Sequence, residues 1–490
     1  MTSSTVRQIR HHDVPAWWRD AKLGIFVHWT PASVPAFAPV DAEIGALMAR
    51  GAPDAMAWSP YAEWYQNSLR FPSSPAARHH AEVHHGRSYY DFGPEWEAGL
   101  EGWDPDYWAE RFAASGARYV VLVSKHHDGY CLWPTGVANP HRPGWNSRRD
   151  VVGELAEAVR ARGLAFGLYY SGGLDWTFNE HPIGTFSDLL LAQPRGDYVD
   201  YAEAQVRELI DRYRPSVLWG DISWPSTANR LARLFGDYYR AVPDGVVNDR
   251  FMPWSPLWAM ASTMPARRLL DRAAARSAAA DAGIVPPKPP MFDVRTPEYT
   301  VFPTARSGAW ECVRGIDRSF GHNRASSEEH FLPRDELVWS LTDIVAKGGN
   351  LLLNVGPRGE DATIASAQLD RLEWLHEFTS GCSEALYATR PWVHASGTGA
   401  GYEVRYTARD QSVFCYVRPT AAGEAAAVES VTLREVTAGP TVSATTLSGS
   451  PLQCKTTAQG LTIWLDSPAS RTRPAVIALQ GVAAAGVDGG

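Results

Sequence analysis

Short apolar runs alternate with amphipathic helical patterns from the start of the chain to about residue 385. The runs are continuously apolar, as expected for strands of a parallel sheet that is covered on both faces. Strands that alternate with helices indicate βα units. This pattern predicts an α/β fold, which we interpret as a (β/α)8-like barrel; periodicity alone leaves an open doubly wound sheet as the alternative. The predicted strands are residues 24–29, 119–125, 165–170, 216–220, 245–248 and 350–355.

Capping residues mark the helices between these runs. Asp104 followed by Pro105 predicts a helix start, and Gly116 follows the helical pattern just before the next strand. Asp150 opens another predicted helix, and Gly163 closes it. Asp as N-cap, Pro in the first turn and Gly after the last turn are the residues that helix ends favour.

The sequence divides into two predicted domains. Residues 1–390 form the barrel domain, with an inserted segment near 252–290 that combines an Ala- and Arg-rich helix with a proline-rich linker. That insertion is either a lid or a solvated surface helix. After residue 390 the composition shifts to Thr, Ser, Val and Gly, with short alternating runs separated by turn residues. Residues 391–490 are therefore predicted to form a C-terminal antiparallel β-sandwich.

Charge and composition exclude several classes of partner. The chain has 46 Lys and Arg against 54 Asp and Glu, a formal net charge of −8, which argues against a nucleic-acid or anionic-membrane partner. No long apolar run and no apolar signal segment are present, so we expect an unexported, cytoplasmic protein. The five cysteines are far apart and predict neither a disulfide framework nor a zinc site.

Polar side chains follow five of the predicted strands. In a barrel, the carboxyl ends of the strands form one rim, and this rim carries the active site. Each residue alone is more often a structural residue than a catalytic one, but five polar strand ends together predict a site. They comprise His28, His126 with His127, Tyr169 with Tyr170, Trp219 with Asp221, and Arg250.

Two carboxylates lie beside aromatic residues. Glu63 precedes Trp64 and Glu311 follows Trp310, where burial would raise a carboxyl pKa. Cleavage of a glycosidic bond needs one ionised and one protonated carboxyl group. The 20 tryptophans agree with a sugar site, because aromatic faces suit the C–H faces of sugars, although most of them could simply fill the core.

A metal site is the competing interpretation of the histidines. His28, His126, His127 and Asp128 are all possible ligands. Adjacent strand residues point to opposite faces, so His126 and His127 can meet one ion only through an irregular turn. No HExxH or HxH spacing is present, and we predict no metal.

A series of ordered motifs resembles glycoside hydrolase family 29, the α-L-fucosidases, from about residue 15 to about residue 390. The motifs are residues 22–29 (KLGIFVHW), 63–65 (EWY), 125–129 (KHHDG), 219–221 (WGD), 247–250 (VNDR), 310–311 (WE), 319–323 (SFGHN), 347–357 (KGGNLLLNVGP) and 387–390 (YATR).

The resemblance implies a retaining exo-hydrolase that removes terminal α-L-fucose from an oligosaccharide or glycoconjugate without a cofactor. It implies that Asp221 is the nucleophile and Glu311 the general acid/base, with Glu63 as the rival for the second role. Tyr170 is an alternative to Tyr169 after a one-residue shift. The remaining implied substrate-binding residues are Phe26, His28, Glu63, Trp64, His126, His127, Tyr169, Trp219 and Arg250.

Two other functions remain open from the sequence. Hydroxyl-binding side chains do not name the sugar, so another sugar-active barrel such as a galactosidase is one alternative. A non-catalytic, lectin-like fucose-binding protein is the second, although the presence of both Asp221 and Glu311 speaks against it. Linkage preference and oligomeric state are not predicted.

Overall fold

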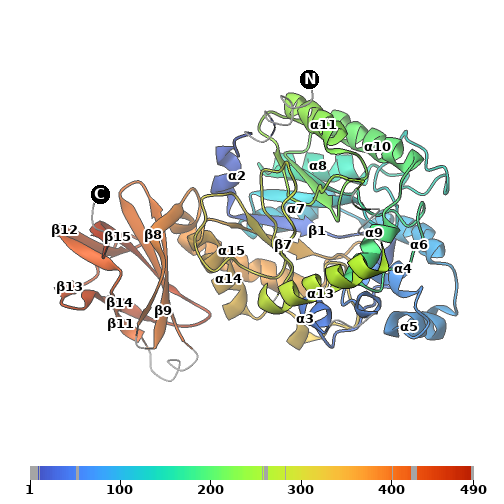
Figure 1. The fold of residues 1–490 in the computed structure, drawn as a ribbon. Helices are drawn as coiled ribbons and strands as arrows, with labels where there is room; N and C mark the ends of the chain where they lie inside the picture. Colours follow the sequence, from blue (N-terminus) through green and yellow to red (C-terminus); the bar gives the residue numbers. More distant parts are fainter. Residues whose placement is uncertain are drawn as a thin grey trace.

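The structure, a computed structural model, describes residue 9 and residues 12–486, apart from 51–53, 257, 259–262, 282, 400 and 421–427. Figure 1 shows a larger α/β part and, beside it, a smaller part built only from strands. Within the described ranges, every helix is too short or too polar to span a lipid bilayer.

A parallel sheet of seven strands forms the centre of the larger part, in the order β5-β4-β3-β2-β1-β7-β6. Its interior and exterior side chains are almost all buried, which explains the continuous apolar runs. The sheet curls as a (β/α)8-like barrel does, so the predicted fold class is confirmed. The strands are β1 Leu23–Val27, β2 Tyr119–Lys125, β3 Ala165–Ser171, β4 Val217–Asp221, β5 Val246–Val247, β6 Glu311–Gly315 and β7 Asn350–Val355.

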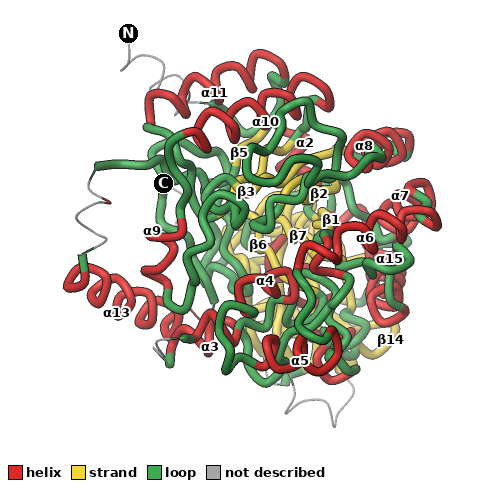
Figure 2. The backbone as a smooth tube through the Cα atoms, turned by 90° about the vertical axis from the view of Figure 1, so that its right-hand side faces the viewer, coloured by secondary structure: helices red, strands yellow, loops and turns green. Residues whose placement is uncertain are grey.

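Helices surround this sheet on the outside, as Figure 2 shows. The side chain of Asp104 caps α7 by accepting two backbone N–H bonds, and that of Asp150 caps α8 by accepting the N–H of Gly153. The helices that follow the strands are α7 Pro105–Ala114, α8 Val151–Ala161, α10 Asp197–Tyr213, α11 Ala228–Ala241, α14 Arg334–Ala346 and α15 Ser366–Leu386.

An irregular segment lies between β5 and β6, where a regular barrel would have another strand. Single parallel bridges pair Asn248 with Val294, Arg295 with Trp310, and Glu298 with Val313. Residues 294–298 therefore continue the sheet from β5 to β6. Neither this segment nor β6 was among the predicted strands.

Several short elements stand on the rim formed by the carboxyl ends of the strands. The helix α13 lies within the predicted insertion, and it packs against α3 and η6. These rim elements are α3 Ile44–Ala49, η2 Ala55–Trp58, η3 Ala62–Trp64, η6 Phe186–Asp188, α9 Leu189–Ala192 and α13 Met264–Asp281.

The smaller part is an antiparallel β-sandwich. A five-stranded sheet in the order β12-β15-β10-β9-β8 faces a three-stranded sheet in the order β11-β14-β13, and both contribute to a core that includes Tyr406 and Leu461. The strands are β8 Arg390–Gly399, β9 Tyr402–Arg409, β10 Ser412–Pro419, β11 Val428–Leu433, β12 Val436–Thr446, β13 Cys454–Thr457, β14 Gly460–Ala469 and β15 Ala475–Ala484.

Candidate active site

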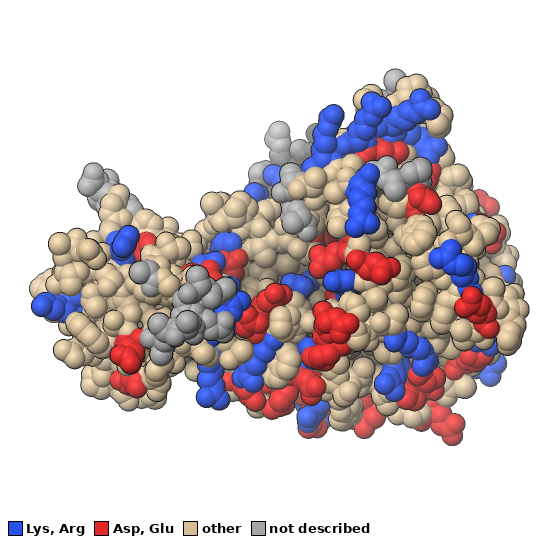
Figure 3. All heavy atoms as spheres, turned by 90° about the horizontal axis from the view of Figure 1, so that it is seen from below, with Lys and Arg blue, Asp and Glu red and all other residues tan. Residues whose placement is uncertain are grey.

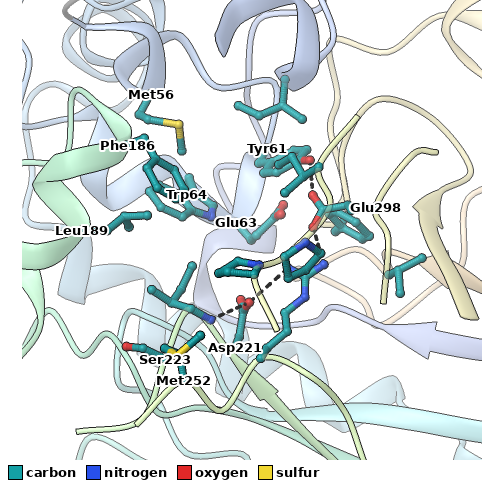
Figure 4. Close-up of a pocket in the computed structure, with 18 of the residues that line it drawn as sticks. Met56, Tyr61, Glu63, Trp64, Phe186, Leu189, Asp221, Ser223, Met252 and Glu298 are labelled. Atoms are coloured by element: carbon teal, nitrogen blue, oxygen red, sulfur yellow. Dashed lines mark hydrogen bonds and ion pairs between the residues drawn. The ribbon is translucent and has the colours of Figure 1, made fainter. Parts of the chain in front are cut away.

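A pocket of about 280 Å³ lies at the carboxyl ends of the strands. Nine of the eleven predicted site residues line it, and Figure 4 shows Glu63, Trp64 and Asp221 around the same hollow. His127 and Glu311 do not line it. The nine are Phe26, His28, Glu63, Trp64, His126, Tyr169, Trp219, Asp221 and Arg250.

Asp221 ends β4 and carries its carboxylate into the pocket. Its Oδ2 accepts the hydroxyl of Tyr169 at 2.9 Å, and its Oδ1 accepts an N–H of Arg250 at 3.3 Å. Nε2 of His127 lies 3.7 Å from Oδ2. Donors therefore surround this carboxylate on several sides and leave it facing the hollow.

Tyr169, rather than Tyr170, faces the pocket. Alternation along β3 turns Tyr170 to the outside, where its hydroxyl donates to Gln205 at 2.9 Å. The one-residue shift that the sequence left open does not occur.

Glu298 is a further carboxyl group in the pocket, and no sequence motif indicated it. Its Oε1 accepts the hydroxyl of Tyr61, and its Oε2 accepts an N–H of Arg250 at 2.8 Å. Arg250 therefore links Glu298 to Asp221, because its guanidinium donates to both carboxyl groups. Two carboxylates that share one guanidinium are close neighbours.

Glu311, the predicted acid, lies below the pocket and outside its lining. It is the first residue of β6, whereas Glu298 pairs with Val313, two residues or roughly 7 Å nearer the rim. Both of its carboxyl oxygens are engaged, with the hydroxyl of Tyr119 at 2.7 Å and with Nε1 of Trp219 at 2.9 Å. Its burial raises the pKa of the Glu311 carboxyl to about 7. Glu311 therefore holds Trp219 in place from beneath.

Glu63 lines the pocket from the short helix η3. Its Oε2 accepts the backbone N–H of Gly321 at 2.8 Å. Burial raises the pKa of the Glu63 carboxyl to about 8, so this group carries a proton at neutral pH. The protonated Glu63 can therefore donate a hydrogen bond to a ligand in the pocket.

The histidines are neutral donors and acceptors. Burial lowers the pKa of His28 and of His127 to about 3, and it lowers the pKa of His126 well below its usual range. Nδ1 of His28 contacts Oδ1 of Asn354 at 2.6 Å, which orients the ring. Nδ1 of His126 and Nε2 of His127 are buried without a hydrogen-bond partner among the described residues. A neutral imidazole nitrogen without a partner can donate a hydrogen bond to a sugar hydroxyl or accept one from it.

The irregular turn that the metal interpretation required does occur. The chain turns directly after β2, and the rings of His126 and His127 lie 4.0 Å apart between centroids. Even so, among the described residues no group of three or more His, Cys, Asp and Glu side chains is arranged to hold a metal ion.

Aromatic rings line the pocket between the polar groups. The ring of Phe26 lies 4.5 Å from that of His28 and 5.1 Å from that of Trp219. The ring of Trp64 meets that of His127 edge to face at 5.2 Å. Aromatic faces beside neutral imidazoles suit a ligand that has both C–H faces and hydroxyl groups.

A family model described as alpha-L-fucosidase matches residues 2–382. An alpha-L-fucosidase of Branchiostoma floridae is 31% identical over 430 residues, which cover 82% of this chain and 79% of that relative.

Two solved structures from Thermotoga maritima share the fold. An alpha-L-fucosynthase in complex with alpha-L-Fuc-(1-2)-beta-L-Fuc-N3 is 35% identical with a TM-score of 0.80, and the match covers 97% of this chain and 98% of that one. An alpha-fucosidase in complex with a mechanism-based inhibitor is also 35% identical, with a TM-score of 0.78 and the same coverage. With the family model spanning most of the chain and the pocket at the expected rim, this chain belongs to the α-L-fucosidases, glycoside hydrolase family 29.

Proposed function

We propose that this enzyme releases terminal α-L-fucose from fucosylated glycosides by a retaining double displacement, with Asp221 as the nucleophile and Glu298 as the general acid/base. The observation that carries the proposal is the guanidinium of Arg250, which donates to both carboxylates. Retaining glycosidases have their two carboxyl groups about 5–5.5 Å apart, and inverting ones about 6.5–9.5 Å. A shared guanidinium supports the shorter class.

In the first step an oxygen of Asp221 forms a bond to the anomeric carbon while the bond to the leaving oxygen breaks. Glu298 gives its proton to that leaving oxygen.

In the second step Glu298 takes a proton from a water molecule, and the oxygen of that water bonds to the anomeric carbon as the bond to Asp221 breaks. Two inversions leave the product in its original configuration, as α-L-fucose.

We assign the remaining polar lining to the sugar hydroxyls. His28, His126 and the protonated Glu63 offer neutral donors and acceptors, and Phe26 offers an apolar surface for the C6 methyl group. The fucosyl ligand of the Thermotoga maritima fucosynthase supports this sugar class.

Glu63 is the rival for the acid role, and its titration separates the two assignments. Since its pKa of about 8 lies above neutrality, the group is protonated below pH 8 and becomes negative above it. The alkaline limb of the kcat/KM profile should contain an ionisation near pH 8, and Glu63→Gln should remove it. At pH 6 this substitution should lower kcat/KM by no more than about tenfold, because the amide still donates a hydrogen bond.

The pH profile of kcat/KM with an aryl α-L-fucoside, for both enzymes, is the measurement. A Glu63→Gln profile that keeps the ionisation near pH 8, or a loss near 10³-fold at pH 6, contradicts the assignment.

The Glu311→Gln substitution tests whether that residue has a catalytic role. An amide can still accept the N–H of Trp219 and can donate to the hydroxyl of Tyr119, so both contacts survive. We expect kcat/KM to fall by less than about tenfold for aryl and alkyl fucosides alike. A loss confined to alkyl fucosides would return the acid role to Glu311.

The experiment that tests the function is proton NMR of the first product from an aryl α-L-fucoside. We expect α-L-fucose before mutarotation and no turnover of the matching aryl β-D-galactoside. β-L-Fucose as the first product would refute retention, and faster galactoside turnover would refute the sugar assignment.

A further inference from the structure

The pocket continues beyond the carboxylates into an outer part with apolar walls. Figure 4 shows Met56, Phe186 and Leu189 gathered on one side of the hollow, across from Asp221 and Glu298. The same lining includes His28, His126 and Glu63, the groups assigned to the sugar hydroxyls. One ligand that fills the whole pocket would therefore meet both polar groups and apolar walls.

The apolar walls come from rim elements rather than from the barrel strands. Met48 lies on α3, Phe186 on η6, Leu189 on α9 and Leu270 on α13, and Pro287 follows α13 in the chain. We call these five side chains the apolar vestibule. The segment predicted from sequence as either a lid or a surface helix thus forms one of its walls.

Polar contacts hold α13 in this position. Arg267 pairs with Asp188, and Asp271 accepts both the backbone N–H and the hydroxyl of Ser187, at 2.8 and 2.9 Å. The outer face of α13 is basic. Figure 3 shows Lys and Arg side chains gathered on the ridge at the upper right. The exposed arginines of the helix are Arg268, Arg272 and Arg276.

The vestibule offers few groups to a sugar hydroxyl. Two serines lie in the pocket lining, and both are engaged: Ser187 with Asp271, and Ser223 by accepting an N–H of Gln193 at 2.7 Å. Hydroxyl groups buried against Met, Leu, Phe and Pro would lose their water without gaining a partner. Aliphatic or aromatic carbon gains free energy on the same surface.

We propose that the vestibule binds the leaving group, and that this enzyme prefers α-L-fucosides whose leaving group is an apolar alcohol or phenol over fucosylated oligosaccharides. The inference rests on the proposed function, since it takes the sugar to lie between Asp221 and Glu63. The inference adds the chemical class of the leaving group to the proposed function.

Methyl and octyl α-L-fucoside test this preference, because they share the sugar and their alcohols have similar acidity. We expect kcat/KM for the octyl compound, used below its micelle concentration, to exceed that for the methyl compound at least about tenfold, because several CH₂ groups leave water. It should also exceed kcat/KM for α-L-fucosyl-(1→2)-galactose.

Substitutions in the vestibule should lower the octyl-to-methyl ratio. We expect Phe186→Ser and Leu270→Ser each to reduce it by about threefold or more, through lost apolar contact. Leu269→Ser is the matched control, because Leu269 is adjacent on α13 but 64% exposed, and it should leave the ratio unchanged. Each ratio is measured on one preparation, so incomplete folding lowers both rates equally.

Three results would overturn the inference: a wild-type ratio near one, a ratio that Phe186→Ser and Leu270→Ser leave unchanged, or a disaccharide cleaved more efficiently than the octyl compound. In each of these cases fucose is still released and the proposed function stands. Failure of the wild-type enzyme to release fucose from any of the three compounds would overturn both.

Discussion

Asp221→Gly should abolish turnover of every α-L-fucoside, with kcat lower by about 10⁴-fold or more. Without this carboxylate no covalent intermediate forms, and the donors around it, Tyr169 and Arg250, have no anion to hold. Steady-state release of fucose from an aryl and an alkyl fucoside is the measurement. The loss should be similar for both, because the missing bond is to the sugar.

Azide provides the control for this variant. The small anion can enter the space left by the carboxylate and attack the anomeric carbon of an activated aryl fucoside, which yields β-L-fucosyl azide and restores turnover. Rescue also shows that the variant folds. Retained activity above one-hundredth of wild type, or an α-configured azide product, would contradict Asp221 as the nucleophile.

Glu298→Gln should give the second largest effect, and its size should depend on the leaving group. We expect kcat/KM for an alkyl fucoside to fall by about 10³-fold, because the alkoxide then leaves without a proton. A dinitrophenyl fucoside needs little protonation, and its kcat/KM should fall by less than about tenfold. The amide keeps the contact with the hydroxyl of Tyr61, so the loss reports proton transfer rather than packing.

Glu311→Gln is the matched control for this comparison, since it makes the same chemical change in a buried carboxyl group below the pocket. The dependence on leaving group should be present in Glu298→Gln and absent in Glu311→Gln. Equal losses on both substrates for Glu298→Gln, or the dependence in Glu63→Gln instead, would move the acid role elsewhere.

The sequence predicted the elements whose local signal is strong. Six strands were recognisable because buried parallel strands are continuously apolar, and Asp104 and Asp150 marked helix starts through side-chain capping. The strand β6 was missed because its five residues include Glu311, Arg314 and Gly315.

The acid that we propose differs from the one that the resemblance implied for a related reason. Glu298 lies in an irregular segment after Pro297, which bridges β5 to β6 without an apolar run, so nothing local marks it as a rim residue. Glu311 stands in a conspicuous Trp-Glu pair, yet as the first residue of its strand it faces the bottom of the barrel. A clue was available: residues that begin a strand lie opposite the rim that carries the site.

The relative position of the His126 and His127 rings could not be predicted from the sequence either, because it depends on the tertiary structure. Strand alternation would place His126 and His127 on opposite faces, but the chain turns after Lys125 and brings the rings together. The position of Asp221 needed no such detail, because it directly ends a predicted strand.

The central claim is that Asp221 attacks the sugar. It is tested most directly by inactivating the enzyme with 2-deoxy-2-fluoro-α-L-fucosyl fluoride, which forms the intermediate but releases it slowly, and locating the label by peptide mass spectrometry. We predict one fluorofucosyl group per chain, on Asp221. A label on Glu63, Glu298 or Glu311, or complete turnover without any label, would contradict the account.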